Sequence, residues 1–286
     1  MVCTRFVFRA ALVAWLTLAT AAGAVAADPA PEPPFDVTLT GTVGIPRGYV
    51  NVRENETAGS HLSLHGDLGI DTVESVELGV AYHLTPLDGF RLRGDSIFLC
   101  GTQQTDEEKF FNGATFTAGS DLQSRPEFFR ITALYERQFF HFANGGRLAG
   151  DVGATYVLLT YKIHGTLAAN TSGTETKEDF LTQELPIPMI GISYEQPLAE
   201  HMRLVGSLLG GYIPWVDSLR SEGGEVKLQQ SHVDFDLGFD YAFNEAMSAG
   251  AGYRVSYFAQ HEKSHEDGND FQLTQNLATF HFTYRF

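Results

Sequence analysis

The chain has 286 residues and a formal net charge of −16, with 35 acidic residues against 19 Lys and Arg. Such an acidic chain would repel phosphate backbones, which excludes nucleic acid as an expected partner. Aromatic residues make up 12% of the sequence, yet beyond residue 26 no apolar stretch approaches the roughly 20 residues that a spanning helix requires. Hydrophobicity dispersed in this way is typical of strands with one apolar face and one polar face.

The first 26 residues predict a secretory signal peptide. Two arginines and no acid precede residue 10, an apolar run follows, and Ala24-Val25-Ala26 has the small side chains of a cleavage site. Cleavage is therefore expected near Ala26. Residues 27–35 contain four prolines and predict an extended lead-in, and residues 36–286 predict a single domain.

Alternation of apolar and polar residues predicts ten strands in this domain. They are expected at 36–45, 75–84, 90–104, 128–142, 147–165, 184–198, 202–216, 226–243, 248–261 and 272–286. Residues 46–74 are treated as one long first loop, although 61–70 alternates weakly and is also compatible with a strand, a short helix or a piece folded into the mouth. Twelve strands would follow if 61–70 were a strand paired with a further, unrecognised strand, and eight if two of the alternating segments were not strands.

The links between the predicted strands alternate in length. Four are short, at 85–89, 143–146, 199–201 and 244–247, and four are long and polar, at 105–127, 168–183, 217–225 and 262–270. Within the first long link, residues 111–119 have a glycine spacing that favours a compact loop. This segment is expected to form a lid at the rim, an inward-folded constriction or an ordinary outer loop.

Three prolines gather at one end of one predicted hairpin. Pro186 and Pro188 begin one strand and Pro214 nearly ends the next, and the turn at 199–201 brings them to the same level. Proline donates no hydrogen bond to a strand ladder, so these residues are expected to loosen pairing there. The alternatives are a lateral notch in the wall or strands that simply end and bend into loops.

The clearest alternation runs from 232 to 243. Val233, Phe235, Leu237 and Phe239 share one face, while Asp234, Asp236 and Asp240 share the other. A lipid-facing side and a polar lumen explain this pattern. The same reasoning predicts a lumen charge network of Arg91, Arg93, Asp95, Arg130, Glu136, Asp234, Asp236, Asp240, Arg254, His281 and Arg285. In a narrow barrel, paired charges would brace the interior, and a charged conduction path is the alternative.

Residues 261–265 satisfy the H-E-x-x-H pattern of zinc proteases through His261, Glu262 and His265. That chemistry needs both histidines on one face of a helix, whereas this segment joins a strand end to a polar loop. These residues are weak metal candidates, and no metal site is predicted. A divalent cation bound by the acidic loop, through Glu262, Glu266, Asp267 and Asp270, is the nearest alternative.

The last strand ends on Phe280, Phe282, Tyr284 and Phe286, which occupy every second position and therefore share one face. This ending resembles the terminal strand of Gram-negative outer-membrane β-barrel proteins, in which alternating aromatics before a C-terminal Phe are read by the barrel-assembly machinery. The resemblance implies a closed antiparallel transmembrane barrel in the cell outer membrane. It also implies that the short links are periplasmic, that the long links are extracellular, and that outer-membrane lipid and lipopolysaccharide are the partners.

Nothing in the sequence specifies an activity. A non-enzymatic role in the cell envelope is expected: structural support, surface binding, or limited passage of small or hydrophobic solutes. The alternatives are a lipid-modifying enzyme acting at the outer rim and a narrow pore. No catalytic residue and no cofactor is predicted.

Overall fold

The computed structural model describes residues 35–53, 59–167, 175–179, 185–217, 226–264 and 268–286. The predicted signal peptide and most of the lead-in lie outside this range. Sixteen strands and no helix occur in the described part, and none of it forms a helix long and apolar enough to cross a membrane.

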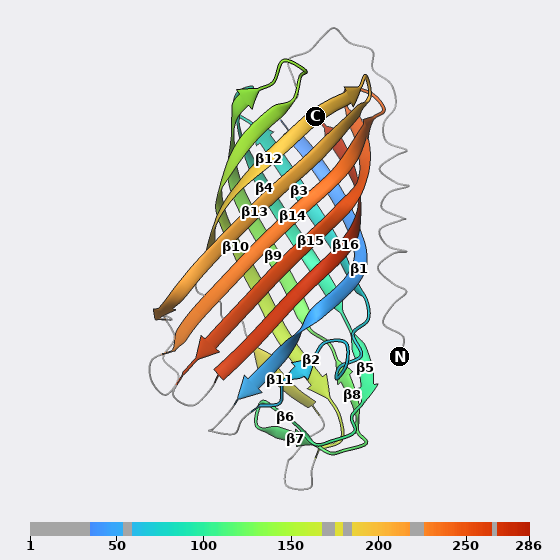
Figure 1. Ribbon diagram of the computed structural model, residues 1–286, viewed down its shortest axis with the longest axis vertical. Helices are drawn as coiled ribbons and strands as arrows, with labels where there is room; N and C mark the ends of the chain where they lie inside the picture. Colours follow the sequence, from blue (N-terminus) through green and yellow to red (C-terminus); the bar gives the residue numbers. More distant parts are fainter. Residues whose placement is uncertain (1–34, 54–58, 168–174, 180–184, 218–225, 265–267) are drawn as a thin grey trace.

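Ten long strands close into an antiparallel barrel (Figure 1), which confirms the predicted fold class and strand number. They are β1 (Phe35–Arg53), β3 (Val73–His83), β4 (Asp88–Leu99), β9 (Glu127–His141), β10 (Arg147–His164), β12 (Ile187–Ala199), β13 (Met202–Asp217), β14 (Lys227–Ala242), β15 (Met247–Lys263) and β16 (Gly268–Arg285). Consecutive long strands pair with one another, and β1 pairs with β16 to close the barrel. The short β11 (Glu175–Asp179) lies between β10 and β12 in sequence, but those two strands pair directly.

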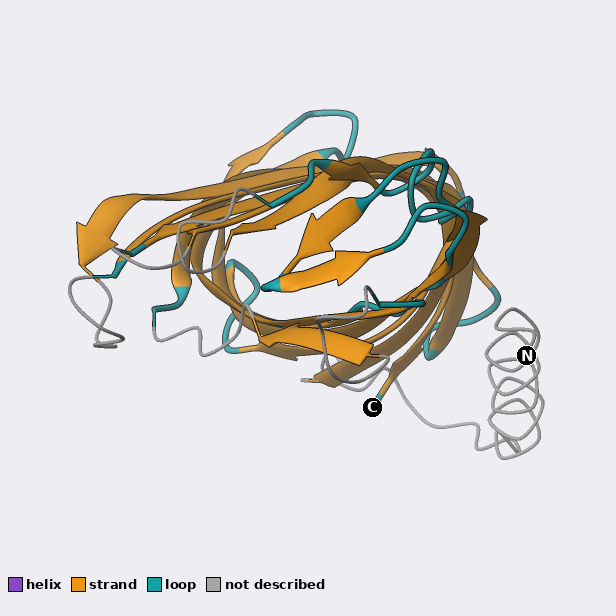
Figure 2. Ribbon diagram, turned by 90° about the horizontal axis from the view of Figure 1, so that it is seen from below, coloured by secondary structure: helices purple, strands orange, loops and turns teal. Residues whose placement is uncertain are grey.

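The barrel has two different ends. At the turn end, near the C-terminus in Figure 1, short links join β3 to β4, β9 to β10, β12 to β13 and β14 to β15. At the loop end lie six short strands: β11, β2 (Leu62–Ser63), β5 (Gly101–Gln104), β6 (Lys109–Phe111), β7 (Ala114–Phe116) and β8 (Asp121–Ser124). Figure 2 looks into the loop end and shows loops and short strands lying across the opening.

The first loop is shorter than predicted, because β1 continues through Pro46 to Arg53. Beyond Gly44 the β1–β3 ladder ends, while the β1–β16 ladder continues, so Pro46 lies where β1 has a ladder on one side. Proline is tolerated at such an edge because one of its sides needs no donor. The last predicted loop is also shorter, since β15 reaches Lys263 and β16 begins at Gly268.

Residues 59–72, which we call the plug, fold into the mouth and are not a barrel strand. Only Leu62 and Ser63 form a strand, β2, and it pairs with Tyr49 and Val50 of β1. Of the structures that the weak alternation of residues 61–70 allowed, the structure therefore has the piece folded into the mouth.

Candidate functional site

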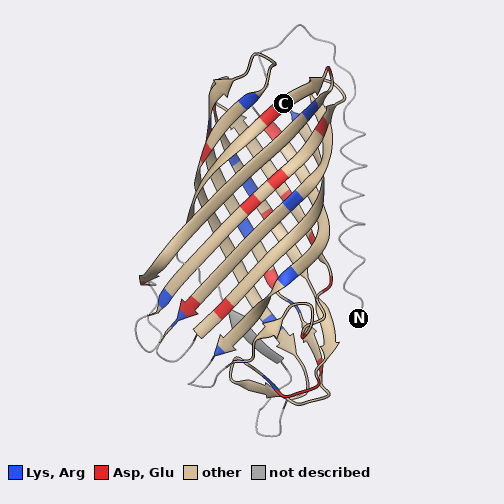
Figure 3. Cartoon of the chain, viewed as in Figure 1, with Lys and Arg blue, Asp and Glu red and all other residues tan. Residues whose placement is uncertain are grey.

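The middle of the barrel is crossed by a layer of paired charges (Figure 3). Arg130 on β9 bonds Asp95 on β4 through Nη2 and Oδ2 at 2.6 Å, and its Nη1 lies 3.4 Å from Oδ1 of Asp234 on β14. The same Nη1 donates to Nε2 of His232 at 2.6 Å. These three partners come from both sides of the lumen, so Arg130 bridges the barrel from wall to wall. Nearly all of its donors are used, as a buried guanidinium requires.

A second arginine completes the layer. Arg254 on β15 donates from Nε to Asp236 at 2.5 Å and from Nη1 to Glu77 on β3 at 3.0 Å. Arg254 and Glu77 are both buried. We call this set, Arg130, Arg254, Glu77, Asp95, Asp234 and Asp236, the charge layer.

Little space remains within the charge layer. A cavity of about 10 Å³ is lined by Glu77, Arg93, Asp95, Arg130, Thr132 and Asp234. That volume holds about one water molecule. Among the described residues Arg93 makes no hydrogen bond or ion pair, and it lies at this cavity. The paired charges and the small cavity between them favour a closed axial path.

Further ion pairs lie between the charge layer and the turn end. Arg91 bonds Asp151 on β10 and lies 3.0 Å from Glu136. Arg203 on β13 donates to Asp240 at 2.8 Å, and Nε2 of His281 lies 2.7 Å from the other oxygen of that carboxylate. Arg285 stands apart, because its nearest carboxylate is Asp36 at 3.8 Å.

All eleven residues of the sequence-based network thus lie between the middle of the barrel and the turn end, and the structure brings ten of them within ion-pair distance of a partner. Sequence reasoning omitted five partners, Asp36, Glu77, Asp151, Arg203 and His232. The signal for Glu77 was present, because it alternates with the outward Val76 and Leu78. The pairs themselves had no local signal, since Arg130 and Asp234 are 104 residues apart.

The loop end of the lumen is apolar and filled. Leu62, Leu64, Leu68 and Ile70 of the plug are fully buried. They share one cluster with wall residues whose side chains face inward, among them Phe128, Tyr161, Phe258 and Phe271. The ring centroids of Phe128 and Phe258 lie 5.2 Å apart, and those of Tyr161 and Phe271 lie 6.0 Å apart. We call this part of the barrel the apolar half.

The β6–β7 hairpin closes the apolar half from outside. Asn112 and Gly113 at its turn have φ of 49° and 70°, the positive pair that a tight hairpin turn requires. Phe111 and Phe116 flank the turn region, and both are fully buried. The segment 111–119 is therefore folded inward, one of the arrangements that its glycine spacing allowed.

An ion pair joins the plug to this hairpin. Asp67 accepts hydrogen bonds from the backbone N–H and hydroxyl of Ser63, and its carboxylate lies 2.9 Å from Nζ of Lys109 on β6. Burial acts to raise the pKa of Asp67, but the bonds from Lys109 and Ser63 outweigh it and hold that pKa below its ordinary value. Burial acts to lower the pKa of Lys109, but Glu107 and Asp67 raise it overall.

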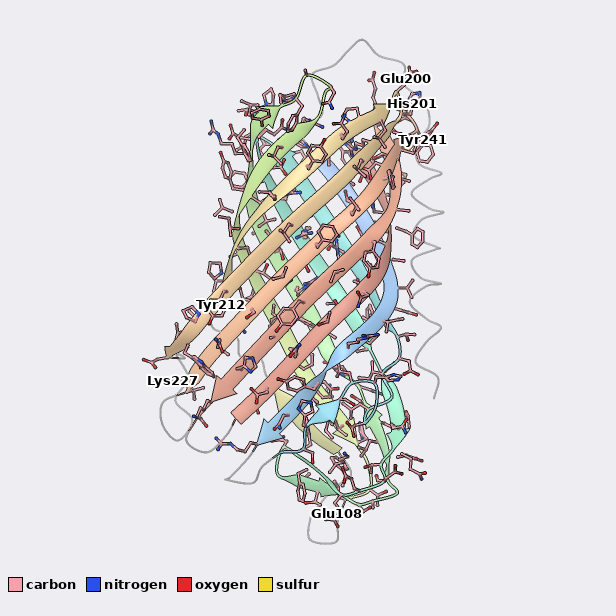
Figure 4. All side chains as sticks on the ribbon, viewed as in Figure 1. Glu108, Glu200, His201, Tyr212, Lys227 and Tyr241 are labelled. Carbon is pink, nitrogen blue, oxygen red and sulfur yellow. The ribbon has the colours of Figure 1, made fainter. Side chains whose placement is uncertain are left out.

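The wall of the apolar half has an interruption between β12 and β13, which we call the seam. Among the described residues the β12–β13 ladder ends at Met189 and Gly211, although β13 continues to Asp217. Beyond Gly211, among the described residues, β13 has a ladder with β14 on one side and none with β12 on the other. This end of the strand extends outward, and Tyr212 lies near it in Figure 4. Pro186 precedes β12, Pro188 is its second residue, and Pro214 lies where the β13–β14 register shifts, between Ile213 and Val216.

Apolar side chains line the seam on both faces. Ile187, Met189, Leu209 and Ile213 are buried on its inner face. On its outer face Ile190 is 73% exposed, and Leu208, Tyr212 and Trp215 are also exposed. The seam therefore has apolar side chains on both of its faces, and none of these eight residues is charged.

The remaining sequence-based sites are placed as follows. His261 lies in extended β15, and its Nδ1 is 2.6 Å from Asp270, while His265 lies outside the described residues. The described residues contain no group of three or more potential metal ligands. Phe280 and Phe286 of the last strand are 51% and 64% exposed on the outer face, and Tyr284 packs against Phe286 with ring centroids 4.6 Å apart. Their role as an assembly signal stays a prediction.

Comparison with known proteins adds the fold alone. No family model and no curated protein matches the chain in sequence. Among solved structures, the outer membrane protease OmpT from Escherichia coli aligns with a TM-score of 0.53 at 12% identity, over 91% of this chain and 99% of OmpT. The translocator domain of the autotransporter NalP from Neisseria meningitidis aligns over the full length of both chains at 12% identity, with a TM-score of 0.45. The chain therefore has the fold of the outer-membrane β-barrel proteins.

Proposed function

We propose that this protein is a non-enzymatic outer-membrane barrel that admits small hydrophobic molecules through its wall and does not conduct along its axis. The observation that carries the proposal is the seam, where the β12–β13 ladder ends beside the apolar half. The charge layer lies between the apolar half and the turn end. A molecule that enters at the seam would meet apolar side chains first and paired charges last.

The position of the seam fits the outer leaflet of the membrane. The resemblance of the last strand to outer-membrane barrels supports a turn end in the periplasm and a loop end outside the cell. Ile190, Leu208 and Trp215 would then contact acyl chains beside the seam, where apolar solutes concentrate. An apolar solute would pass from lipid to the apolar half without crossing water, so its transfer would need no dehydration step.

Conductance and binding measurements test the two parts of the proposal. In planar bilayers we expect no unitary current steps, because the charge layer leaves room for about one water. With 1-aminoanthracene as an apolar fluorescent probe, we expect saturable binding to the folded protein in lipid vesicles. Steady unitary steps from the unmodified protein would contradict a closed axial path.

Proline substitutions provide a matched test of the seam. The variant with Pro186→Thr, Pro188→Thr and Pro214→Thr gains three backbone donors at the seam, which favours pairing there, and we expect several-fold weaker probe binding. Pro86→Thr, in the turn between β3 and β4, is the control and should bind the probe like the unmodified protein. Equal probe binding by the triple variant and the control would count against entry at the seam.

A further inference from the structure

A larger cavity lies at the turn end, outside both the charge layer and the seam. It has a volume of about 180 Å³ and lies beside the turn between β12 and β13. Its lining includes Pro197, His201, Met202, Ala242, Ser248 and Arg285. Figure 4 shows Glu200, His201 and Tyr241 together at this end of the barrel. Since an apolar cavity of about 150 Å³ accepts benzene, this cavity, which we call the turn-end pocket, has room for one small ring or its equivalent.

Ser248 presents an unused hydroxyl to the turn-end pocket. Its side chain faces the lumen near the start of β15, and the residue is 3% exposed. Its Oγ is buried and has no hydrogen-bond partner in the structure. Buried hydroxyl groups are nearly always bonded, so an unbonded one that lines a cavity indicates a missing partner there.

Arg285 places in the same pocket a guanidinium that donates no hydrogen bond to a carboxylate of the described residues. Its Nε lies 3.8 Å from Oδ1 of Asp36, which is too long for a hydrogen bond. That oxygen of Asp36 is itself buried and unbonded, while the other lies 3.3 Å from His83. No hydrogen bond from the Arg285 guanidinium occurs among the described residues, and its fork of donors matches the two oxygens of a carboxylate.

Arg203, the other arginine at this pocket, differs from Arg285 because carboxylates of the wall accept its hydrogen bonds. Arg203 also lines the turn-end pocket, but it donates from Nε and Nη2 to one oxygen of Asp240 at 2.9 and 2.8 Å. Its Nη1 lies 3.4 Å from Glu195. Arg203 is therefore held in the wall, and Arg285 is the arginine of the pocket that is open to a ligand.

We propose that the turn-end pocket binds a small carboxylate with a short apolar body. The carboxylate accepts hydrogen bonds from Arg285 and from the hydroxyl of Ser248. The guanidinium donors of Arg285 are available to it because Asp36 lies too far away to accept them. Pro197, Met202 and Ala242 contact the apolar body. The ligand would reach the pocket from the periplasmic side, so this site is independent of entry at the seam.

A pair of matched probes tests the charge requirement. Benzoate and benzamide have nearly the same shape, but only benzoate carries a charge. With the full barrel folded in zwitterionic micelles and protein-free micelles as the blank, titration calorimetry should give about tenfold tighter binding of benzoate, because charge-assisted hydrogen bonds to a guanidinium are the stronger kind. Equal binding of the two probes, or no binding of either, would overturn the proposal.

Three variants assign the binding to this pocket. Arg285→Gln should remove the preference for benzoate, and Arg137→Gln, an exposed arginine at the same end but outside the pocket, should keep it. Because Arg285 lies within the terminal strand and its loss could prevent folding, Ala242→Phe provides a second test by filling the pocket. Unchanged benzoate binding in folded Ala242→Phe protein would show that the ligand binds elsewhere and would contradict the assignment.

Discussion

The two halves of the lumen are filled by opposite means. Between the middle and the turn end, the strands themselves supply charged side chains that pair across the barrel, as Arg130 does with Asp95 and Asp234. In the apolar half, the filling comes from chain outside the barrel strands, the plug and the β6–β7 hairpin, packed on inward-facing wall residues. The charge layer belongs to the wall strands, whereas most of the plug lies outside the strand ladders. We therefore expect the plug to open at a lower free energy than the charge layer.

The largest expected effect follows from breaking the charge layer. Arg130→Leu leaves Asp95 and Asp234 buried without their main cation, and we expect a loss of about 3–5 kcal/mol in the free energy of unfolding. Denaturant unfolding in phospholipid vesicles measures it. Arg137→Gln removes an arginine of the same strand that is 63% exposed, and it should change stability by less than about 0.5 kcal/mol. If both variants unfold at the same denaturant concentration, the charge layer does not brace the barrel.

A smaller and more local effect is expected in the apolar half. Leu64→Ala creates a cavity under the plug at a cost of about 2–4 kcal/mol. Because the plug can open by itself, the loss should appear as faster hydrogen exchange of residues 59–72, with little change in global unfolding. Leu78→Ala makes the same truncation on the outer face, where Leu78 is 53% exposed, and it should leave plug exchange unchanged. Loss of global stability in Leu64→Ala would instead show that plug and barrel unfold together.

The smallest effect concerns the polar contacts of the plug. The folded pKa of Asp67 is lowered from 3.8, so its stabilisation is present above that value and is lost as the pH falls through the folded pKa. The folded pKa of Lys109 is raised from 10.5, so its contribution is complete below that value and is lost only at higher pH. Plug exchange should therefore be protected equally from about pH 5 to pH 9, after correction for intrinsic rates, and lose protection below about pH 4.

Asp67→Asn isolates this contribution. We expect it to weaken plug protection by about 1 kcal/mol at pH 7 and to remove the acid dependence below pH 4. Glu107→Gln removes the other partner of Lys109, a side chain that is 75% exposed, and should have a smaller effect. If the acid dependence persists in Asp67→Asn, other carboxylates control the plug.

The sequence predicted the two halves unequally for a physical reason. A strand in a barrel wall has a period of two, so alternation alone separated inward Asp234 from outward Phe235 and identified ten strands. Pairing across the lumen depends on the stagger of the whole barrel, which no local pattern contains. The buried side chains of the plug, Leu62, Leu64, Leu68 and Ile70, all lie at even positions, so their alternation alone could not distinguish a barrel strand from a segment folded into the mouth. Their burial follows from the shape of the mouth that receives them.

The ladder between β1 and β16 has a practical consequence for the chain ends. It runs through eighteen residue pairs, from Asp36 and Arg285 to Arg53 and Gly268, and the N–H of Phe286 donates to the carbonyl of Phe35 at 2.9 Å. A linker of a few residues could join these ends, and the chain could be reopened in the turn between β14 and β15. Such a circular permutant would keep every strand neighbour while moving the aromatic ending into the interior of the chain. It would thereby separate the contribution of these aromatic residues to the stability of the folded barrel from their contribution to its assembly in the membrane.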